Sequence, residues 1–177
     1  MRYVALLRGV NVGGNNKVSM SDLKKCFENA GFQNVSTYIN SGNIFFESEE
    51  INIEKLISNC KEILVKEFGF PISLTIIDAD TLKEALDHAP EWWGEVLDTK
   101  HNALFVIPPA TAAEVMTGIG EIKPNYENVS AYKNIIFWSA PIKTFSRTRW
   151  SKIVGTKSYQ DVTIRNSNTT KKLLELI

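Results

Sequence analysis

Apolar residues near the start of the chain follow first the spacing of a strand and then that of a helix. Residues 3–8 (YVALLR) form an apolar run of strand length. A polar, glycine-rich stretch follows, and Ser19 or Ser21 is placed to cap a helix that Gly31 would end. On one face of that helix the apolar residues are Met20, Leu23, Phe27 and Ala30.

Two stretches further along resemble each other and indicate how the whole chain is organised. They are NVSTYINSGNIFF at residues 34–46 and NVSAYKNIIFW at residues 128–138. Each has β-branched and aromatic residues on either side of a short polar connection, which is typical of a β-hairpin. We therefore predict one hairpin in each half of the chain.

The elements around the first hairpin have counterparts around the second. After the first, a long amphipathic helix is predicted over residues 53–68, ended by Gly69, and then a strand at residues 71–77. The second half begins with a strand at residues 102–107 (NALFVI), and a helix is expected after Pro109.

The second hairpin is also expected to be followed by a helix and a strand. The helix is predicted at residues 147–155 (RTRWSKIVG) and the strand at residues 162–164 (VTI). Each half then has the order β-α-β-β-α-β, which is the ferredoxin-like arrangement with both helices on one side of an antiparallel sheet. We predict an α+β fold in which two such halves pack together, because a sheet covered on one side needs cover for the other.

Two helices fall outside the repeated pattern. A linker helix is expected at residues 81–89 (TLKEALDHA), begun by Asp80 and stopped by Pro90. A C-terminal helix is expected at residues 169–177 (TTKKLLELI), and its N-cap is Asn168 or Thr169.

The expected domain organisation has three parts. They are a first ferredoxin-like half at residues 1–78, a linker helix and loop at residues 79–100, and a second half with the C-terminal helix at residues 101–177. The linker contains Trp92 and Trp93, and we expect this pair to fill the seam between the halves rather than to stack on a ligand.

Composition agrees with a folded chain that has a substantial core. The 177 residues are 44% hydrophobic and 23% charged, which excludes wholesale disorder. Cys26 and Cys60 occupy apolar helix positions and predict buried thiols instead of a disulfide framework. These cysteines fit a reducing cytoplasm, and because no apolar run reaches membrane-spanning length, we expect a soluble, cytoplasmic protein. The residues predicted for the core are Leu6, Leu23, Phe27, Leu56, Cys60, Leu64, Leu104, Val106, Ile135 and Phe137.

Charge is balanced over the chain but unevenly placed along it. The formal net charge is zero, so no overall field attracts nucleic acid or an acidic membrane. Between Lys143 and Lys172, however, eight lysines and arginines are accompanied by Asp161 alone among the acids. Such a run is either a solvated face or a binding patch, and the sequence leaves both interpretations open.

The loop after the first strand is the best candidate for a site. Arg8 and Lys17 supply positive charge, and Asn11, Gly13 and Gly14 supply amides and flexible backbone. A strand, a loop rich in backbone N–H groups and a helix N-terminus together suit an anion. The alternative is a long turn that needs glycine and asparagine for positive φ.

Two further segments contribute candidate ligand-binding residues. Asn43 belongs to the tip of the first hairpin, where the sequence SGN also suits a tight turn. Arg165 and Asn166 follow the last strand, where an arginine presents a planar donor fork to a phosphate or carboxylate. The alternatives are an ion pair for Arg165 and a helix cap in the polar run.

The sequence lacks the residue patterns that most catalytic and metal-binding sites need. His88 and His101 are not spaced as metal ligands with another histidine, cysteine or acidic cluster. No serine lies in a nucleophile elbow, and no nucleotide fingerprint occurs. We therefore expect no metal and no cofactor, and the sequence identifies no catalytic residue.

Several motifs resemble those of a widespread bacterial family, domain-of-unknown-function family 1697. The motifs are LLRGVNVGG, TYINSGNIFF and TIRNSNTTKKL, so the resemblance spans the chain. It implies a fold that agrees with the duplicated halves, and it implies no established activity. The family usually has an aromatic residue after its Arg-Asn pair, where this chain has Ser167. The family's recurrent polar positions fall on Arg8, Asn11, Gly13, Gly14, Tyr38, Ser41, Gly42, Asn43, Thr163, Arg165 and Asn166.

Three functional hypotheses follow from these observations. The first is a protein that binds a small phosphate-bearing or carboxylate ligand, provided that Arg8, Lys17 and Arg165 converge on one pocket. The second is a nucleic-acid-binding module, which ranks lower because the chain is neutral and lacks the RNP consensus. The third is a scaffold or oligomer subunit without a ligand. The sequence leaves open the ligand, any enzymatic activity and the oligomeric state.

Overall fold

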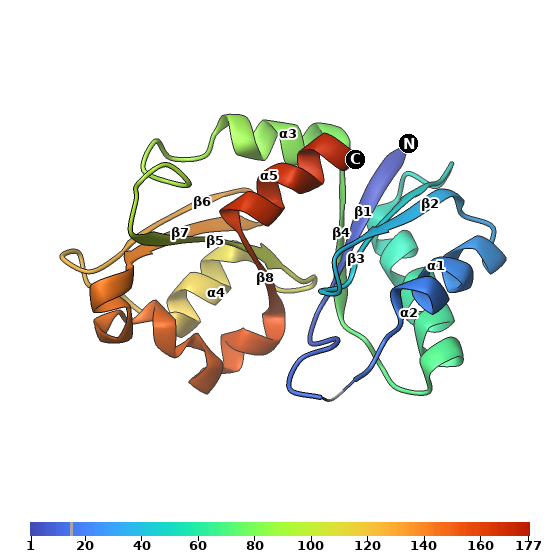
Figure 1. Ribbon diagram of the computed structural model, residues 1–177, viewed down its shortest axis with the longest axis horizontal. Coiled ribbons are helices and arrows are strands. Elements are labelled where there is room, and N and C mark those ends of the chain that lie inside the picture. The colour runs from blue at the N-terminus through green and yellow to red at the C-terminus, as the bar shows by residue number, and fades with distance from the viewer. Residues whose placement is uncertain (15) are drawn as a thin grey trace. The chain divides into compact units, whose positions relative to one another are not determined.

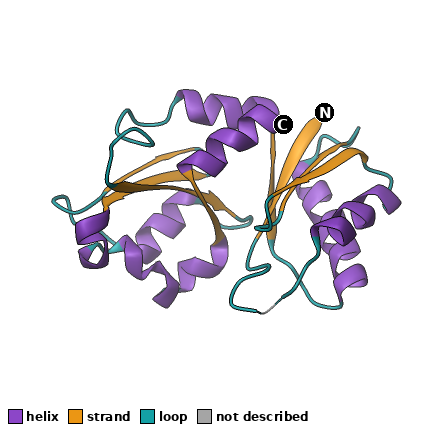
Figure 2. Cartoon of the chain, viewed as in Figure 1, coloured by secondary structure: helices purple, strands orange, loops and turns teal. Residues whose placement is uncertain are grey.

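Two four-stranded antiparallel sheets and the helices beside them make up the chain, which confirms the α+β prediction (Figures 1 and 2). The computed structural model describes residues 1–14 and 16–177; Asn15, in the candidate loop, lies outside the described residues. The chain divides into two compact units. Unit 1 comprises residues 1–82 and 173–177, and unit 2 comprises residues 83–172.

Unit 1 follows the order of elements predicted from its sequence. Its strands lie in the order β2-β3-β1-β4 and all neighbours are antiparallel, with Val4 opposite Phe45 on one side of β1 and Ile77 on the other. The elements are β1 (Arg2–Leu7), α1 (Met20–Asn29), β2 (Gln33–Tyr38), β3 (Asn43–Glu47), α2 (Ile53–Phe68) and β4 (Leu74–Asp78).

Unit 2 contains the second sheet, whose strands lie in the order β6-β7-β5-β8. Its elements are β5 (Thr99–Val106), α4 (Ala112–Ile119), β6 (Asn128–Tyr132), β7 (Ile135–Pro141), the 3-10 helices η1 (Ile142–Arg147), η2 (Trp150–Gly155) and η3 (Lys157–Asp161), and β8 (Val162–Asn166). Two more helices, α3 (Ala79–Asp87) and α5 (Ser167–Leu176), each contain residues of both units.

The helix predicted at residues 147–155 is present only as the 3-10 helix η2, over Trp150–Gly155, and not as an α-helix. The Thr148 hydroxyl donates to Phe145 O at 2.8 Å and accepts from Ser151 N at 3.0 Å. The backbone N–H groups of Arg149 and Trp150 donate to the Glu127 carboxylate. Lys152 N donates to Arg149 O and Thr156 N donates to Ile153 O, so the backbone bonds join residues three apart and the segment forms short 3-10 turns.

Helix ends follow local sequence, with two corrections to the predicted caps. Ser19 caps α1 by accepting from Asp22 N, and Gly69 (φ 77°) ends α2, as predicted. For α3, Asp78 accepts from Thr81 N at 2.8 Å in place of Asp80, because the helix starts directly after β4. For α5, Asn166 accepts from Thr169 N at 2.8 Å in place of Asn168 or Thr169.

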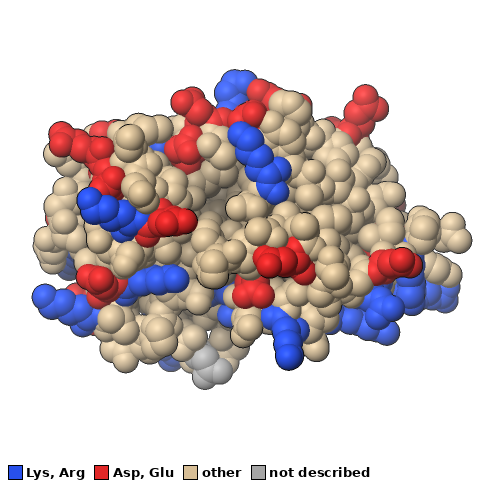
Figure 3. All heavy atoms as spheres, turned by 180° about the vertical axis from the view of Figure 1, so that it is seen from behind, with Lys and Arg blue, Asp and Glu red and all other residues tan. Residues whose placement is uncertain are grey.

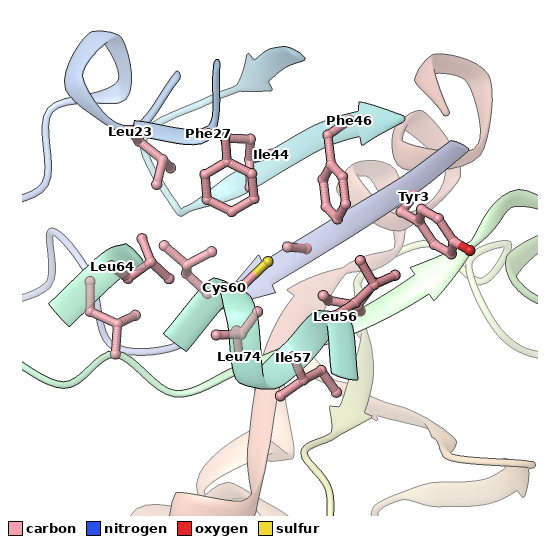
Figure 4. Packing of buried hydrophobic residues seen from close by; sticks show 14 of the residues in the cluster. Tyr3, Leu23, Phe27, Ile44, Phe46, Leu56, Ile57, Cys60, Leu64 and Leu74 are labelled. Carbon is pink, nitrogen blue, oxygen red and sulfur yellow. The ribbon is translucent and has the colours of Figure 1, made fainter. Parts of the chain in front are cut away.

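The core of unit 1 lies between one face of its sheet and helices α1 and α2 (Figure 4). Tyr3 and Phe46 point from the sheet toward Leu56 and Cys60 of α2. Leu6 is fully buried, but it alternates with Ala5 and Leu7 and therefore lies on the opposite face of the sheet. The predicted core members in this cluster are Leu23, Phe27, Leu56, Cys60 and Leu64.

Unit 2 has a corresponding core between its sheet, α4 and the 3-10 segment. Leu104 and Val106 belong to this cluster, and Trp150 and Ile153 of η2 occupy the place of the expected second helix. Ile135 and Phe137 are buried on the opposite face, where the Phe137 ring contacts Trp93 with 5.0 Å between centroids. All ten predicted core residues are buried, and Leu6, Ile135 and Phe137 among them lie on the face of the sheet opposite the helix-side clusters.

Candidate functional site

The loop after β1 and the tip of the β2–β3 hairpin meet in unit 1. Leu7 N donates to Gly42 O at 2.8 Å, and Asn11 Nδ2 donates to Asn40 O at 2.9 Å. Gly42 has φ of 76°, and a Cβ atom placed there would lie 2.7 Å from Val10 Cγ2. Glycine at residue 42 therefore allows the hairpin tip to approach the loop closely.

Asn11 holds the loop closed. Its Nδ2 also donates to Val18 O at 2.8 Å, and its Oδ1 accepts from Val18 N at 2.9 Å. Its backbone has φ of 56°, in the left-handed region that asparagine tolerates. Both amide N–H groups of Asn11 are therefore used to brace the loop against the start of α1 and the hairpin tip, and this residue shapes the site.

A pocket of about 580 Å³ opens between this loop and the N-terminus of α1. Exposed Lys17 supplies a positive charge beside the first turn of the helix, where backbone N–H groups carry partial positive charge. Asp22 lies in the same turn, and its N–H donates to Ser19 Oγ at 3.4 Å. The lining residues are Asn11, Gly14, Lys17, Val18, Ser19, Met20 and Asn40.

Arg8, Gly13 and Gly14 complete the predicted loop set. Arg8 lies one residue beyond β1, is half-buried, and donates its backbone N–H to Ser73 O at 2.9 Å. Gly13 and Gly14 have φ of 61° and 80°, and a Cβ atom at either would meet no atom within 4 Å. Conformation rather than space therefore favours glycine at these two positions.

Asn43 stabilises the turn beside the pocket. Its side chain is fully buried, and Nδ2 donates to Tyr38 O at 2.9 Å and to Ser41 Oγ at 3.0 Å. These bonds close the β2–β3 connection on itself. A direct contact between Asn43 and a ligand stays a prediction.

Arg165 and Asn166 belong to unit 2, whereas the loop set belongs to unit 1. Arg165 is buried, donates through Nη1 to Thr163 Oγ1 at 2.8 Å and to Ile164 O at 2.9 Å, and burial lowers its pKa to about 10. Asn166 caps α5. The convergence of Arg165 with Arg8 stays a prediction.

A second polar cluster, which sequence reasoning missed, lies between α3 and the β6–β7 turn of unit 2. Tyr132 Oη donates to Glu84 Oε1 at 2.6 Å, and the Lys133 ammonium pairs with the same carboxylate. These partners lower the pKa of Glu84, and the bond to Glu84 raises the pKa of Tyr132. The His88 ring stacks on Tyr132 at 4.3 Å between centroids. No sequence motif joins residues so far apart in the chain.

Metal-binding and thiol chemistry can be judged from the described residues. Among them, no group of three His, Cys, Asp or Glu side chains is arranged to hold a metal ion. Cys26 and Cys60 are free and buried, and burial raises the pKa of these thiols to about 11 and about 12. Neither forms a reactive thiolate near neutral pH. In the same described part of the chain, no helix has the length and apolar character needed to cross a bilayer.

Comparison with known proteins places the chain in a family. A search of curated proteins finds no match. The fold is similar to that of the conserved bacterial protein SP0830 from Streptococcus pneumoniae, with a TM-score of 0.89 and 30% sequence identity over 98% of this chain and 97% of that one. The model of the family described as "Protein of unknown function (DUF1697)" matches residues 1–137, and the chain belongs to that family.

Proposed function

We propose that the pocket between the β1–α1 loop and the N-terminus of α1 binds a small anionic ligand that carries a phosphate or carboxylate group. The observation that carries the proposal is the presence of Lys17, Gly14 and Ser19 around one pocket at the start of a helix. A helix N-terminus and a lysine together attract and hold negative charge.

The bracing of the loop favours a ligand site over a flexible turn. Asn11 ties the loop to Val18 and Asn40, so Lys17 and the first turn of α1 are held near each other before any ligand arrives. A preorganised site loses less conformational entropy on binding than a mobile loop does.

We also infer that each unit is ferredoxin-like and that the two arose by internal duplication. The orders β2-β3-β1-β4 and β6-β7-β5-β8 correspond strand by strand, and the hairpin sequences at residues 34–46 and 128–138 resemble each other. On this basis we assign residues 1–78 to the first ferredoxin-like half and residues 101–177 to the second half with the C-terminal helix. The buried free thiols of Cys26 and Cys60 favour a cytoplasmic location, where thiols stay reduced.

Titration calorimetry tests the ligand proposal, with inorganic phosphate, a nucleoside diphosphate and citrate as probes. Wild-type protein is expected to bind at least one of them, and Lys17→Gln is expected to weaken that binding about tenfold, because a charge-assisted contact is lost. Lys25→Gln, an equal charge change at an exposed position of α1, is the matched control. The proposal fails if no probe binds or if both variants bind as wild type does.

A further inference from the structure

Unit 2 has a surface on which basic side chains gather. Figure 3, which views the chain from behind, shows lysine and arginine side chains together at its lower right, with acidic groups at the border. We propose that this basic surface binds nucleic acid through the backbone phosphates, a role separate from the pocket of unit 1. We define the surface by Lys100, Lys123, Lys143, Arg147, Arg149 and Lys152.

The sequence of the 3-10 segment concentrates positive charge in a neutral chain. Residues 142–160 contain five lysines and arginines and no aspartate or glutamate. Their side chains are exposed, whereas Trp150 and Ile153 of the same segment are buried in the core of unit 2. Trp150 and Ile153 therefore fasten the segment to the core of unit 2, and the cations face solvent.

A buried carboxylate fixes the backbone that presents these cations. Glu127 is only 2% exposed and accepts from Arg149 N at 2.7 Å, from Trp150 N at 3.1 Å and from Lys123 N at 3.1 Å. The Glu127 carboxylate is thus engaged with backbone N–H groups. It also joins Lys123, which follows α4, to the start of η2.

Two further contacts bring residues of other elements to the same surface. Lys123 Nζ donates to Arg147 O at 3.0 Å. Lys100 of β5 lies over the Phe145 ring of η1, with Nζ 4.1 Å from the ring centroid. The surface therefore combines a strand, a loop and two 3-10 helices, and it is wider than the run of charge in the sequence.

Several other cations of unit 2 differ from this surface because they form ion pairs. Lys133 pairs with Glu84 and Lys171 pairs with Glu95. Within the described residues, none of the six cations of the basic surface forms an ion pair with an aspartate or glutamate. Exposed cations without acidic partners favour an external polyanion.

The arrangement fits a nucleic-acid backbone better than it fits a membrane. Several cations spread over consecutive turns match a row of phosphates, and guanidinium groups hold phosphate with two parallel hydrogen bonds. A segment that lies on a membrane needs a continuous apolar face to insert. Here Trp150 and Ile153 are buried in the core, and the large apolar residues that the segment exposes, Ile142 of η1 and Val154 of η2, lie in separate turns and do not make a continuous face.

The experiment compares a surface variant with a charge-matched control. Lys143→Gln, Arg147→Gln and Lys152→Gln are combined in one protein, and Lys25→Gln, Lys61→Gln and Lys66→Gln in another, all at exposed positions. Fluorescence anisotropy measures binding of a labelled single strand and a labelled duplex over a range of salt concentrations. Sedimentation with phosphatidylserine vesicles measures membrane binding.

Wild-type protein is expected to bind the oligonucleotides, with an affinity that falls as salt rises. The surface variant is expected to lose about tenfold or more in affinity at low salt, and the slope of log affinity against log salt for the single strand is expected to decrease by about 2, since each phosphate contact contributes roughly 0.7. The control and Lys17→Gln are expected to bind as wild type does. A preference for single strand or duplex identifies the form of nucleic acid that the surface takes.

Three results would overturn the proposal. They are no oligonucleotide binding by wild type, an equal loss in the surface variant and the control, and binding of vesicles without binding of oligonucleotides. Thermal unfolding of each variant checks the fold, and little change is expected because exposed cations contribute little to stability.

Discussion

At the scale of single residues, a few side chains in unit 1 decide the shape of the candidate pocket. Asn11 uses both amide N–H groups to join the loop to Val18 and Asn40, and Gly42 lets the hairpin tip approach Val10. These residues act by shaping backbone around the pocket. Lys17 is the side chain that places a full charge at its rim.

Gly42→Ala is expected to lower the free energy of unfolding by about 2–4 kcal/mol, since both strain and overpacking oppose it. The new Cβ would lie 2.7 Å from Val10 Cγ2 and 2.8 Å from Leu7 Cβ, at φ of 76°. Gly13→Ala is the control, because φ is 61° but nothing lies within 4 Å. Gly13→Ala should lower the free energy of unfolding, measured in urea, by only about 1 kcal/mol. Equal losses in the two variants would mean that the close approach at Gly42 is not tight.

At the scale of elements, amphipathic helices and strand alternation account for the packing. On α2, Leu56, Cys60 and Leu64 recur on the face that covers the sheet, and Val65 faces solvent. In the strands, neighbouring apolar residues point to opposite faces. This is why Leu6, Ile135 and Phe137 are buried on the face of the sheet opposite the helix-side clusters.

Leu56→Ala is expected to destabilise unit 1 by about 2–5 kcal/mol, because it removes a large side chain from a closed core. Leu56 is 1% exposed and lies between α2 and the sheet. Val65→Ala on the same helix is the control, since Val65 is 43% exposed and should change stability by at most about 0.5 kcal/mol. Chemical unfolding measures both. If Leu56→Ala leaves the midpoint unchanged, the assigned face of α2 is incorrect.

At the scale of the whole molecule, ionisable groups set the pH range of stability. Lys55, Lys133 and Lys171 lower the pKa values of Glu50, Glu84 and Glu95 below the ordinary value of 4.5. Burial raises the thiol pKa values of Cys26 and Cys60 above their ordinary value of 9.0, to about 11 and about 12. The free energy of unfolding is therefore expected to fall at both low and high pH.

Thermal unfolding followed across pH is expected to give a plateau with a decline on each side. Below pH 4.5 the unfolded chain takes up protons that folded Glu50, Glu84 and Glu95 resist, so stability falls as pH falls. Above pH 9.0 the unfolded chain releases thiol protons that buried Cys26 and Cys60 retain, so stability falls as pH rises. Cys60→Ala should flatten the alkaline decline. An unchanged alkaline slope in that variant would exclude Cys60 as its source.

The sequence alone determined most of the elements of this protein, because helix periodicity, strand alternation and caps depend on residues close together in the chain. The repeated hairpins at residues 34–46 and 128–138, the Ser19 cap and the Gly69 stop are local features of this kind. These local features were enough to predict the α+β class and to select the loop after β1 as the candidate site.

Which distant residues act together depends on how the chain folds in three dimensions. Asn11 bonds to Asn40, and Glu127 bonds to the backbone of Arg149, across 29 and 22 residues of sequence. The second of these contacts holds the backbone at the start of η2. Strands that are buried on both faces are continuous apolar runs. Such a run does not indicate which of its residues face the helices. Such choices depend on the energy of packed, long-range contacts, which local sequence patterns do not contain.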